Sequence, residues 1–275
     1  MTLALLYVAA AAAYAYAFVS RRELAGRVAT AVLVAAALVH TFQIGMATVE
    51  LGVPPLAGRE GAIGGFVLML AVTYLYVELS TAERTIGTFV TPLLAGLQLL
   101  VAGGDAPTTA SAAVLGEGRF LAFHVGALLS AYASFALACV IGLTYVLLFR
   151  ELKTRTPGVF FSRLPPLQVL DRMNLRAVTA GWLLLTVGLI AGAFWLVDAR
   201  ATMPHDPRVA AMTPLDPKIL LAVSCWLLYS GQIAARRWGG LSARRTAWLS
   251  ALGFALVLLN FLPVAYFFSR SHNFA

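Results

Sequence analysis

The chain has 275 residues, of which 60% are hydrophobic and 12% are charged, and its mean hydropathy is +0.84. This composition excludes a water-soluble domain, because so few polar residues could not cover an apolar core of that size. The net charge of +8 would suit a nucleic-acid-binding protein, but the basic residues lie between long apolar runs and serve as a topology signal.

Eight apolar runs are long enough, or nearly so, to cross a membrane as helices, since a span needs about 20 residues. The fourth and seventh are short, and the fifth is long enough to extend beyond the bilayer. We therefore predict an all-α fold, a polytopic membrane helical bundle of about eight transmembrane helices that forms one domain over residues 1–275. The predicted spans are 2–20, 28–48, 61–80, 86–103, 120–149, 177–198, 218–235 and 246–268.

The first run ends in a way that resembles a signal peptide, because Ala-Tyr-Ala occurs near its end. A signal peptide carries its positive charge before the apolar run, whereas Arg21 and Arg22 follow it here. We therefore expect a retained first helix with its N-terminus outside the cytoplasm.

Lysine and arginine are distributed unequally between the two sets of connections. The connections near 20–27, 80–85, 150–176 and 236–245 hold 14 of the 20 basic residues. The positive-inside rule places these connections in the cytoplasm and both termini outside, in the cytoplasmic (inner) membrane of a cell. Six basic residues lie on the opposite side, namely Arg59, Arg119, Arg200, Arg208, Lys218 and Arg270.

Two connections and one span carry further local signals. The connection 150–176 is expected to contain a short surface helix before the sixth span, and 199–217, with four prolines and no aromatic residue, is expected to be a loop. Within the sixth span, Gly181, Gly188 and Gly192 lie on nearly one face. Small residues on one stripe favour close helix packing over a catalytic role.

Three of the four histidines fall at the end of the bundle that the charge pattern places outside. Imidazole is the usual axial ligand of haem iron. His124 begins the fifth span and His272 follows the last one, so the two could approach across the bundle. Taken singly, His124 is equally well explained as an interfacial residue, whereas His272 is better explained as part of a frayed tail than as a ligand. His205 lies between prolines in a loop, and we expect it to be solvated.

Two ionisable residues lie within predicted spans. His40 is about 18 Å into the second span, a depth at which a functional site is the first interpretation and a neutral imidazole bonded to a neighbouring helix is the alternative. Glu78, near the inner end of the third span, is expected to reach the membrane interface. Asp216 begins the seventh span, where a helix-capping role is favoured. Cys139 and Cys225 lie in spans and are expected to be packing residues.

The chain resembles the CcsA/CcmC family of cytochrome c assembly proteins, which handle haem in membranes. The resemblance is most specific from residue 170 onward and covers most of the chain. It rests on residues 170–177 (LDRMNLRA), 185–195 (LTVGLIAGAFW) and 87–92 (GTFVTP), on Asp216-Pro217-Lys218 with Trp226 and Tyr229, on Arg237-Trp238-Gly239, and on His124-Val125 with Tyr132.

The resemblance implies a haem site at the outer face. His124 and His272 would be the axial ligands of a b-type haem held without a covalent link. His40 matches one histidine of a membrane-embedded pair. Asp216, Trp226 and Tyr132 belong to the segments that resemble the family's binding segments. From the topology, we expect that the cations on the same side, Lys218, Arg270 and Arg208, could pair with the haem propionates.

The chain departs from the family at its tryptophan-rich platform, which reads roughly Trp-Gly-x-x-Trp-x-Trp-Asp-Pro-Lys-Glu. No tryptophan precedes Asp216 within the loop, Ile219 replaces the glutamate and Leu221 replaces a tryptophan. Position 234, where the second embedded histidine is expected, is Ala234. These departures indicate a diverged branch similar to HemX and YpjD, which lacks part of the haem-presenting apparatus.

The leading expectation is a membrane protein of cytochrome c biogenesis that positions haem at the outer face and does not itself catalyse a turnover. No Gly-x-Ser-x-Gly, His-Glu-x-x-His or Walker-type loop occurs. A ResB-like assembly protein or apocytochrome c would be the partner. The alternative is a HemX-like regulator of tetrapyrrole synthesis whose 150–176 connection contacts glutamyl-tRNA reductase. A third possibility is a transporter or structural subunit whose histidines bridge helices.

Overall fold

The computed structural model describes residues 1–56, 58–103, 119–154, 162–203 and 216–261, together with Gly158, His205 and Val209. Within these residues the chain is all-α, as predicted, and the helices follow the predicted order. The helices are α1 (Thr2–Ser20), α2 (Glu23–Leu51), α3 (Gly58–Thr81), α4 (Gly87–Val101), α6 (Arg119–Thr154), α8 (Leu167–Thr202), α10 (Pro217–Arg237) and α11 (Ala243–Phe261).

Six of these helices, in the part of the chain that the structure describes, are long and apolar enough to cross a membrane: α1, α2, α3, α6, α8 and α10. Large apolar side chains such as Phe42, Leu183 and Leu227 are exposed on their outer faces. In water such exposure would be unfavourable, whereas lipid accepts it. The chain is a multi-pass membrane protein.

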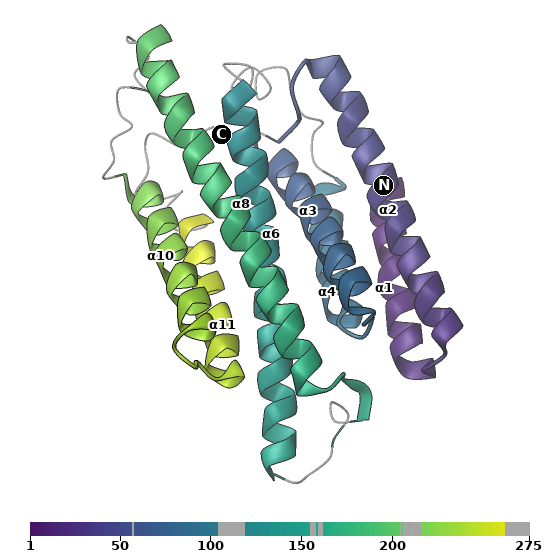
Figure 1. Ribbon diagram of the computed structural model, residues 1–275. Helices are drawn as coiled ribbons and strands as arrows, with labels where there is room; N and C mark the ends of the chain where they lie inside the picture. Colours follow the sequence, from purple (N-terminus) through teal and green to yellow (C-terminus); the bar gives the residue numbers. More distant parts are fainter. Residues whose placement is uncertain are drawn as a thin grey trace.

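Two long helices form the centre of the bundle. α6 and α8 have 36 residues each, which at the helical rise gives about 54 Å and exceeds the thickness of the hydrocarbon core. They run side by side, with α10 and α11 packed on one side and α1 to α4 on the other (Figure 1). The molecule therefore has two halves that meet along this pair.

Glycines on α8 allow it to lie close to α6. A Cβ at Gly181 would lie 2.6 Å from the ring of Phe135, and a Cβ at Gly188 would lie 2.9 Å from Leu128. The same stripe continues to Gly192. The packing role predicted for these glycines is confirmed, because a side chain at either position would push the two helices apart.

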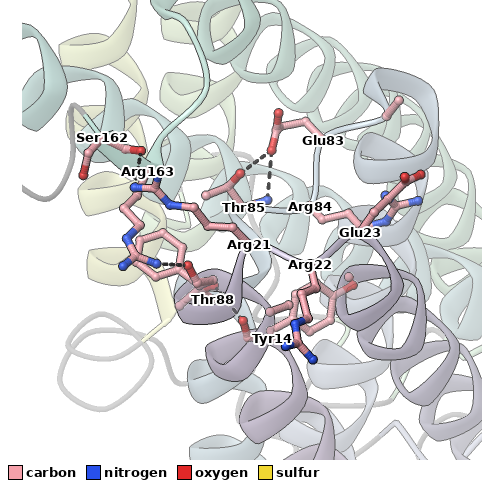
Figure 2. Close-up of a pocket in the computed structure, with 14 residues that line it drawn as sticks. Tyr14, Arg21, Arg22, Glu23, Glu83, Arg84, Thr85, Thr88, Ser162 and Arg163 are labelled. Atoms are coloured by element: carbon pink, nitrogen blue, oxygen red, sulfur yellow. Dashed lines mark hydrogen bonds between the residues drawn. The ribbon is translucent and has the colours of Figure 1, made fainter.

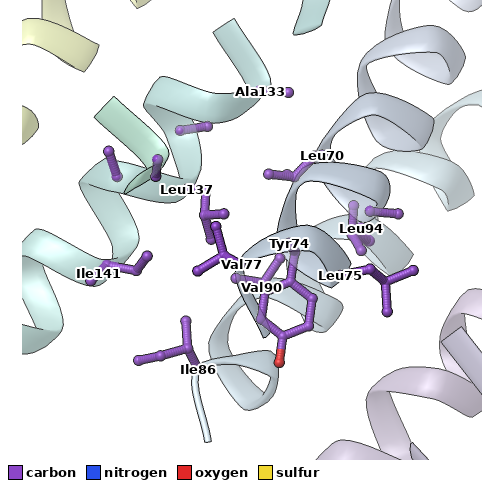
Figure 3. Packing of buried hydrophobic residues seen from close by; sticks show 14 of the residues in the cluster. Leu70, Tyr74, Leu75, Val77, Ile86, Val90, Leu94, Ala133, Leu137 and Ile141 are labelled. Atoms are coloured by element: carbon purple, nitrogen blue, oxygen red, sulfur yellow. The ribbon is translucent and has the colours of Figure 1, made fainter. Parts of the chain in front are cut away.

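The main apolar core lies where α3 and α4 pack against α6 (Figure 3). Val77 of α3, Val90 of α4, and Leu137 and Ile141 of α6 are all fully buried there. In lipid the hydrophobic effect does not drive helices together, so this contact depends on dispersion between well-fitted side chains.

The arginine-rich connections meet at one end of the bundle. Arg163, just before α8, donates to the carbonyl oxygen of Val19 at the end of α1 (2.8 Å), and Arg176 donates to that of Ser80 on α3 (2.5 Å). An ion pair joins the end of α10 to the start of α8. At the opposite end, the connection before α3 packs against α6 and α8. The alternation of connections therefore follows the charge pattern, and the side of the membrane that each end faces stays a prediction.

The short surface helix predicted in the connection 150–176 stays a prediction: Ser162 and Arg163 are helical just before Pro165-Pro166, and other parts of this connection lie outside the described residues. α8 runs without a break from Leu167 to Thr202, directly after Pro166. Leu170 and Met173 in its first turns are fully buried. Since these apolar side chains pack into the bundle and no proline or glycine interrupts the first turns, residues 167–176 belong to the same helix as the sixth span.

Candidate functional site

His124 lies on α6, near the end of the bundle opposite the arginine-rich connections. Its Nδ1 is 2.7 Å from the carbonyl oxygen of Gly188 on α8. A carbonyl oxygen only accepts hydrogen bonds, so the ring donates its Nδ1 proton, and in the neutral imidazole the lone pair lies on Nε2. Histidines that bind metals are commonly oriented in this way by a backbone carbonyl.

Gly192 provides the space that the His124 ring occupies. A Cβ at Gly192 would lie 2.6 Å from both Cε1 and Nδ1 of the ring, which is too close for either group to stay in place. α8 therefore orients His124 through one residue and accommodates it through another, one turn further on. The glycine stripe was the sequence signal for close packing, but it did not indicate which side chain would fill the space.

Trp195 is a further residue of this region that the sequence did not single out as a site residue. Its side chain is 6% exposed and packs with Leu56 and with Leu121 of α6. Within the described residues its Nε1 has no hydrogen-bond partner. A buried N–H without an acceptor is costly, so the indole is a donor suited to an oxygen of a bound ligand.

These residues fit haem as a ligand in two respects. An imidazole with a defined tautomer suits one axial position of the iron, and an unmatched indole N–H suits a propionate oxygen. The described residues contain no group of three or more His, Cys, Asp or Glu side chains that could hold a metal ion. A haem iron does not need such a group, because the porphyrin supplies four of its ligands.

Asp216 caps α10, as predicted. Its Oδ1 accepts a hydrogen bond from the backbone N–H of Lys218 at 2.9 Å, and Pro217 occupies the first turn. Asp216 is buried and Lys218 is half-buried. The cap places the start of α10 at the same end of the bundle as His124, with Lys218 as a cation in its first turn.

Trp226 and Tyr132 lie deeper in the bundle. Trp226, in the middle of α10, donates from Nε1 to Thr186 on α8 (2.8 Å), and its ring stacks with Trp182 at a centroid distance of 6.2 Å. Tyr132 is half-buried against the main core, two turns along α6 from His124. Trp226 joins α10 to α8, and the predicted roles of both residues toward a cofactor stay predictions.

Three of the predicted site residues, His272, Arg270 and Arg208, lie outside the described residues. His205 lies in a turn with its side chain exposed, as expected. Of the predicted axial pair, the structure therefore places His124 alone.

His40 lies in the other half of the molecule, on α2, with only 4% of it exposed. Its Nδ1 is 3.1 Å from the hydroxyl of Tyr7 on α1, so the bond to a neighbouring helix that the alternative interpretation requires is present. The ring also lines a cavity of about 490 Å³ between α1, α2, α3 and α4, where Nε2 is the ring atom nearest the position of a Cβ on Gly64. Gln98, whose Oε1 has no partner within the described residues, lines the same cavity.

The position expected to hold a second embedded histidine is not part of this cavity. Ala234 lies on α10, in the other half of the bundle, and the described lining of the cavity comes from α1 to α4 and the connection before α3. His40 is thus separated from position 234 by the central pair of helices (Figure 1).

The prediction that Glu78 reaches the interface is wrong. Its side chain is 1% exposed and accepts hydrogen bonds from the hydroxyls of Tyr14 and Thr30, both at 2.5 Å. Arg84 Nε lies 3.8 Å from the carboxyl group. Donors from three elements satisfy the carboxyl group inside the bundle, so it has no need to reach water.

Comparison with known proteins gives one family over nearly the whole chain. The family model for the cytochrome c assembly protein matches residues 1–272. The cytochrome c biogenesis protein CcsA of Guillardia theta is 24% identical over 257 residues, which cover 87% of this chain and 82% of the relative. A protein of the same description from Synechococcus sp. (strain RCC307) is 25% identical, and the match covers 88% of this chain and 83% of that relative. Another, from Chlorella vulgaris, is also 25% identical, and the match covers 82% of this chain and 78% of that relative.

Proposed function

Because the chain belongs to the cytochrome c assembly protein family, we propose that it handles haem at the outer face of the membrane for cytochrome c biogenesis. His124 and His272 would hold a non-covalent b-type haem as its two axial ligands. When bound, haem would supply an iron centre for which the two imidazoles would be the protein ligands. The observation that carries the proposal is the Nδ1 hydrogen bond of His124 to the Gly188 carbonyl, since it fixes the tautomer and the orientation of the ring.

Different residues of the chain would contribute to haem binding in different ways. Gly188 and Gly192 on α8 orient the His124 ring and give it room. Trp195 would donate its indole N–H to a propionate, and its ring is held by packing in an apolar cluster with Leu56 and Leu121. Lys218, with Arg270 and Arg208, would supply cations for the propionates.

We further infer that the chain belongs to a diverged branch similar to HemX and YpjD. Ile219 and Leu221 stand where the family platform carries a glutamate and a tryptophan. With fewer aromatic residues to enclose the porphyrin, the chain would position haem and pass it to a partner, a ResB-like protein or an apocytochrome c. The membrane would be the cytoplasmic membrane, as the charge pattern indicates.

A HemX-like regulator that contacts glutamyl-tRNA reductase through residues 150–176 is the alternative. Two basic residues of this connection, Arg163 and Arg176, bind backbone carbonyls of α1 and α3 instead of standing free at the surface. This use of the arginines within the bundle favours haem handling.

The test is the absorption spectrum of the full chain, purified in detergent after growth with haem supplied. We expect a Soret band in the wild type, a weaker or shifted band in His124→Ala and in His272→Ala, and little or no band in the double variant. Added imidazole should partly restore either single variant by occupying the vacated position.

His205→Ala is the matched control, because this histidine lies in the connection between α8 and α10, on the side predicted to face outside, and its side chain is exposed. It should leave the spectrum unchanged. A wild-type protein that stays colourless with haem supplied would overturn the proposal and favour the regulator.

A further inference from the structure

A second cavity opens at the arginine-rich end of the bundle, far from His124. It has a volume of about 380 Å³ and lies where α1 turns into α2 and where α3 turns into α4, and Ser162 and Arg163 of the segment before α8 complete its lining (Figure 2). Its charged lining consists of four arginines and two glutamates: Arg21, Arg22, Arg84, Arg163, Glu23 and Glu83.

Two of the arginines are held in place by groups that do not neutralise them. Arg21 donates to the carbonyl oxygen of Ser162 at 2.9 Å, and Arg163 donates to that of Val19 at 2.8 Å. The guanidinium of Arg163 also lies 5.5 Å from the ring centroid of Phe18. Carbonyl oxygens and an aromatic face fix the geometry of a guanidinium while leaving its full positive charge.

The carboxylates near the cavity have partners of their own. Glu23 pairs with Arg27 at 2.7 Å, and Glu78, behind the cavity, lies 3.8 Å from Arg84. Glu83 accepts hydrogen bonds from the backbone and the hydroxyl of Thr85. The cavity therefore keeps an excess of positive charge, carried by its remaining arginines.

The backbone at this cavity is strained in two places. Within the described residues, Arg21 (φ 57°) and Ala82 (φ 56°) are the non-glycine residues with positive φ, and both line the cavity. Glycine would adopt this conformation at lower cost, by about 1 kcal/mol or more. Position 21 therefore carries an arginine at a backbone cost that a glycine would avoid.

We propose that this cavity binds the phosphate group of an anionic phospholipid headgroup. Guanidinium groups bind phosphate oxygens through paired N–H donors, and basic clusters at helix ends attract anionic lipids. The cavity lies at the ends of membrane-spanning helices, and its lining includes the apolar Ala17 and Phe18 beside the arginines. This mixed lining fits a headgroup with the start of its acyl chains better than a free phosphate ion.

The test measures binding to the delipidated full chain in detergent. Dioctanoyl phosphatidylglycerol, dioctanoyl phosphatidylcholine and inorganic phosphate are titrated separately, and the thermal unfolding midpoint reports binding. Phosphatidylglycerol should raise the midpoint saturably, and the other two should have little effect. Native mass spectrometry should find one retained anionic lipid.

Arg21→Gly and Arg163→Gln should each weaken the apparent affinity for phosphatidylglycerol about tenfold, since each removes one charged contact to phosphate. Arg21→Gly is informative because glycine suits the positive φ, so the midpoint without lipid should hold or rise. Arg245→Gln removes the same charge from the exposed start of α11 and is the matched control, expected to change affinity less than about twofold.

Two results would overturn the proposal. Equal weakening in Arg245→Gln would show that general charge, and not this cavity, attracts the lipid. Inorganic phosphate binding as tightly as phosphatidylglycerol would assign the cavity to a soluble phosphate compound instead of a lipid.

Discussion

His40 and His124 are held by different kinds of partner, one in each half of the bundle. His40 is buried and its Nδ1 meets the hydroxyl of Tyr7, whereas the Nδ1 of the half-buried His124 meets the carbonyl oxygen of Gly188. A hydroxyl can donate or accept, so it permits either tautomer of His40. A carbonyl only accepts, so it selects one tautomer of His124. The carbonyl of Gly188 thus fixes which ring nitrogen of His124 carries the proton, whereas the hydroxyl of Tyr7 does not fix it for His40.

The surroundings of His40 are polar, whereas those of His124 are shaped by glycines. In the half that contains His40, two tyrosines seven residues apart on α1, Tyr7 and Tyr14, each bond one ionisable residue of a neighbouring helix, His40 and Glu78. In the other half, glycines on α8 give His124 its place. Hydrogen bonds from the tyrosines hold His40 and Glu78 in place, whereas the close approach of the α8 backbone holds His124 in place.

The largest effect is expected in a test of which end of the bundle faces the cytoplasm. A reporter enzyme that is active only outside the cytoplasm should work when fused after Ala275 and should fail when fused near Arg155. Reporter activity is the measurement. Activity at both positions, or the reverse pattern, would remove the reason for grouping His124 with His272 at an outer face.

The second effect tests whether the space beside His124 matters. Gly192→Ala should displace the ring, because the new Cβ would lie 2.6 Å from two of its atoms. Overpacking of about 1–3 kcal/mol corresponds to a loss of about 5- to 150-fold in haem affinity, measured by haem titration and the Soret band. Gly231→Ala is the control, since its Cβ would meet nothing within 4 Å. Equal haem affinity in both variants would argue against His124 as a ligand.

The third effect compares the two tyrosines of α1. Tyr14→Phe should lower the free energy of unfolding by about 2 kcal/mol and Tyr7→Phe by about 1 kcal/mol, because a hydrogen bond to a buried carboxyl group is the stronger one. Denaturant titration in detergent is the measurement. Tyr16→Phe, on the same helix with an exposed side chain, should change stability by less than about 0.5 kcal/mol. A larger loss for Tyr7→Phe than for Tyr14→Phe would reverse the order assigned to the two bonds.

The smallest effect is expected for His40→Ala. Position 234 is alanine and lies outside the His40 cavity, so we expect haem at the outer face to be largely intact in this variant. The haem content and the Soret maximum should match those of the wild type. If the band disappeared while the protein stayed folded, the ligand assignment would have to move into the membrane.

The sequence by itself determined the class of protein and the order of its parts. Long apolar runs can only be satisfied as helices in lipid, and the unequal distribution of arginine predicted which connections share an end. The spacing of Gly181, Gly188 and Gly192 predicted a packing face, and Asp216 before Pro217 predicted a helix cap. These features depend on residues close together in the chain, so their signal is local.

The tertiary structure alone decided what the polar side chains meet. His124 bonds a carbonyl 64 residues away, Tyr14 bonds Glu78 at the same separation, and Arg21 bonds a carbonyl 141 residues away. Nothing in a short window indicates such partners, which is why Glu78 was expected at the interface and Trp195 was overlooked. Helix periodicity states which face of a helix is apolar, but the rotation and depth of the neighbouring helix determine which donor meets which acceptor.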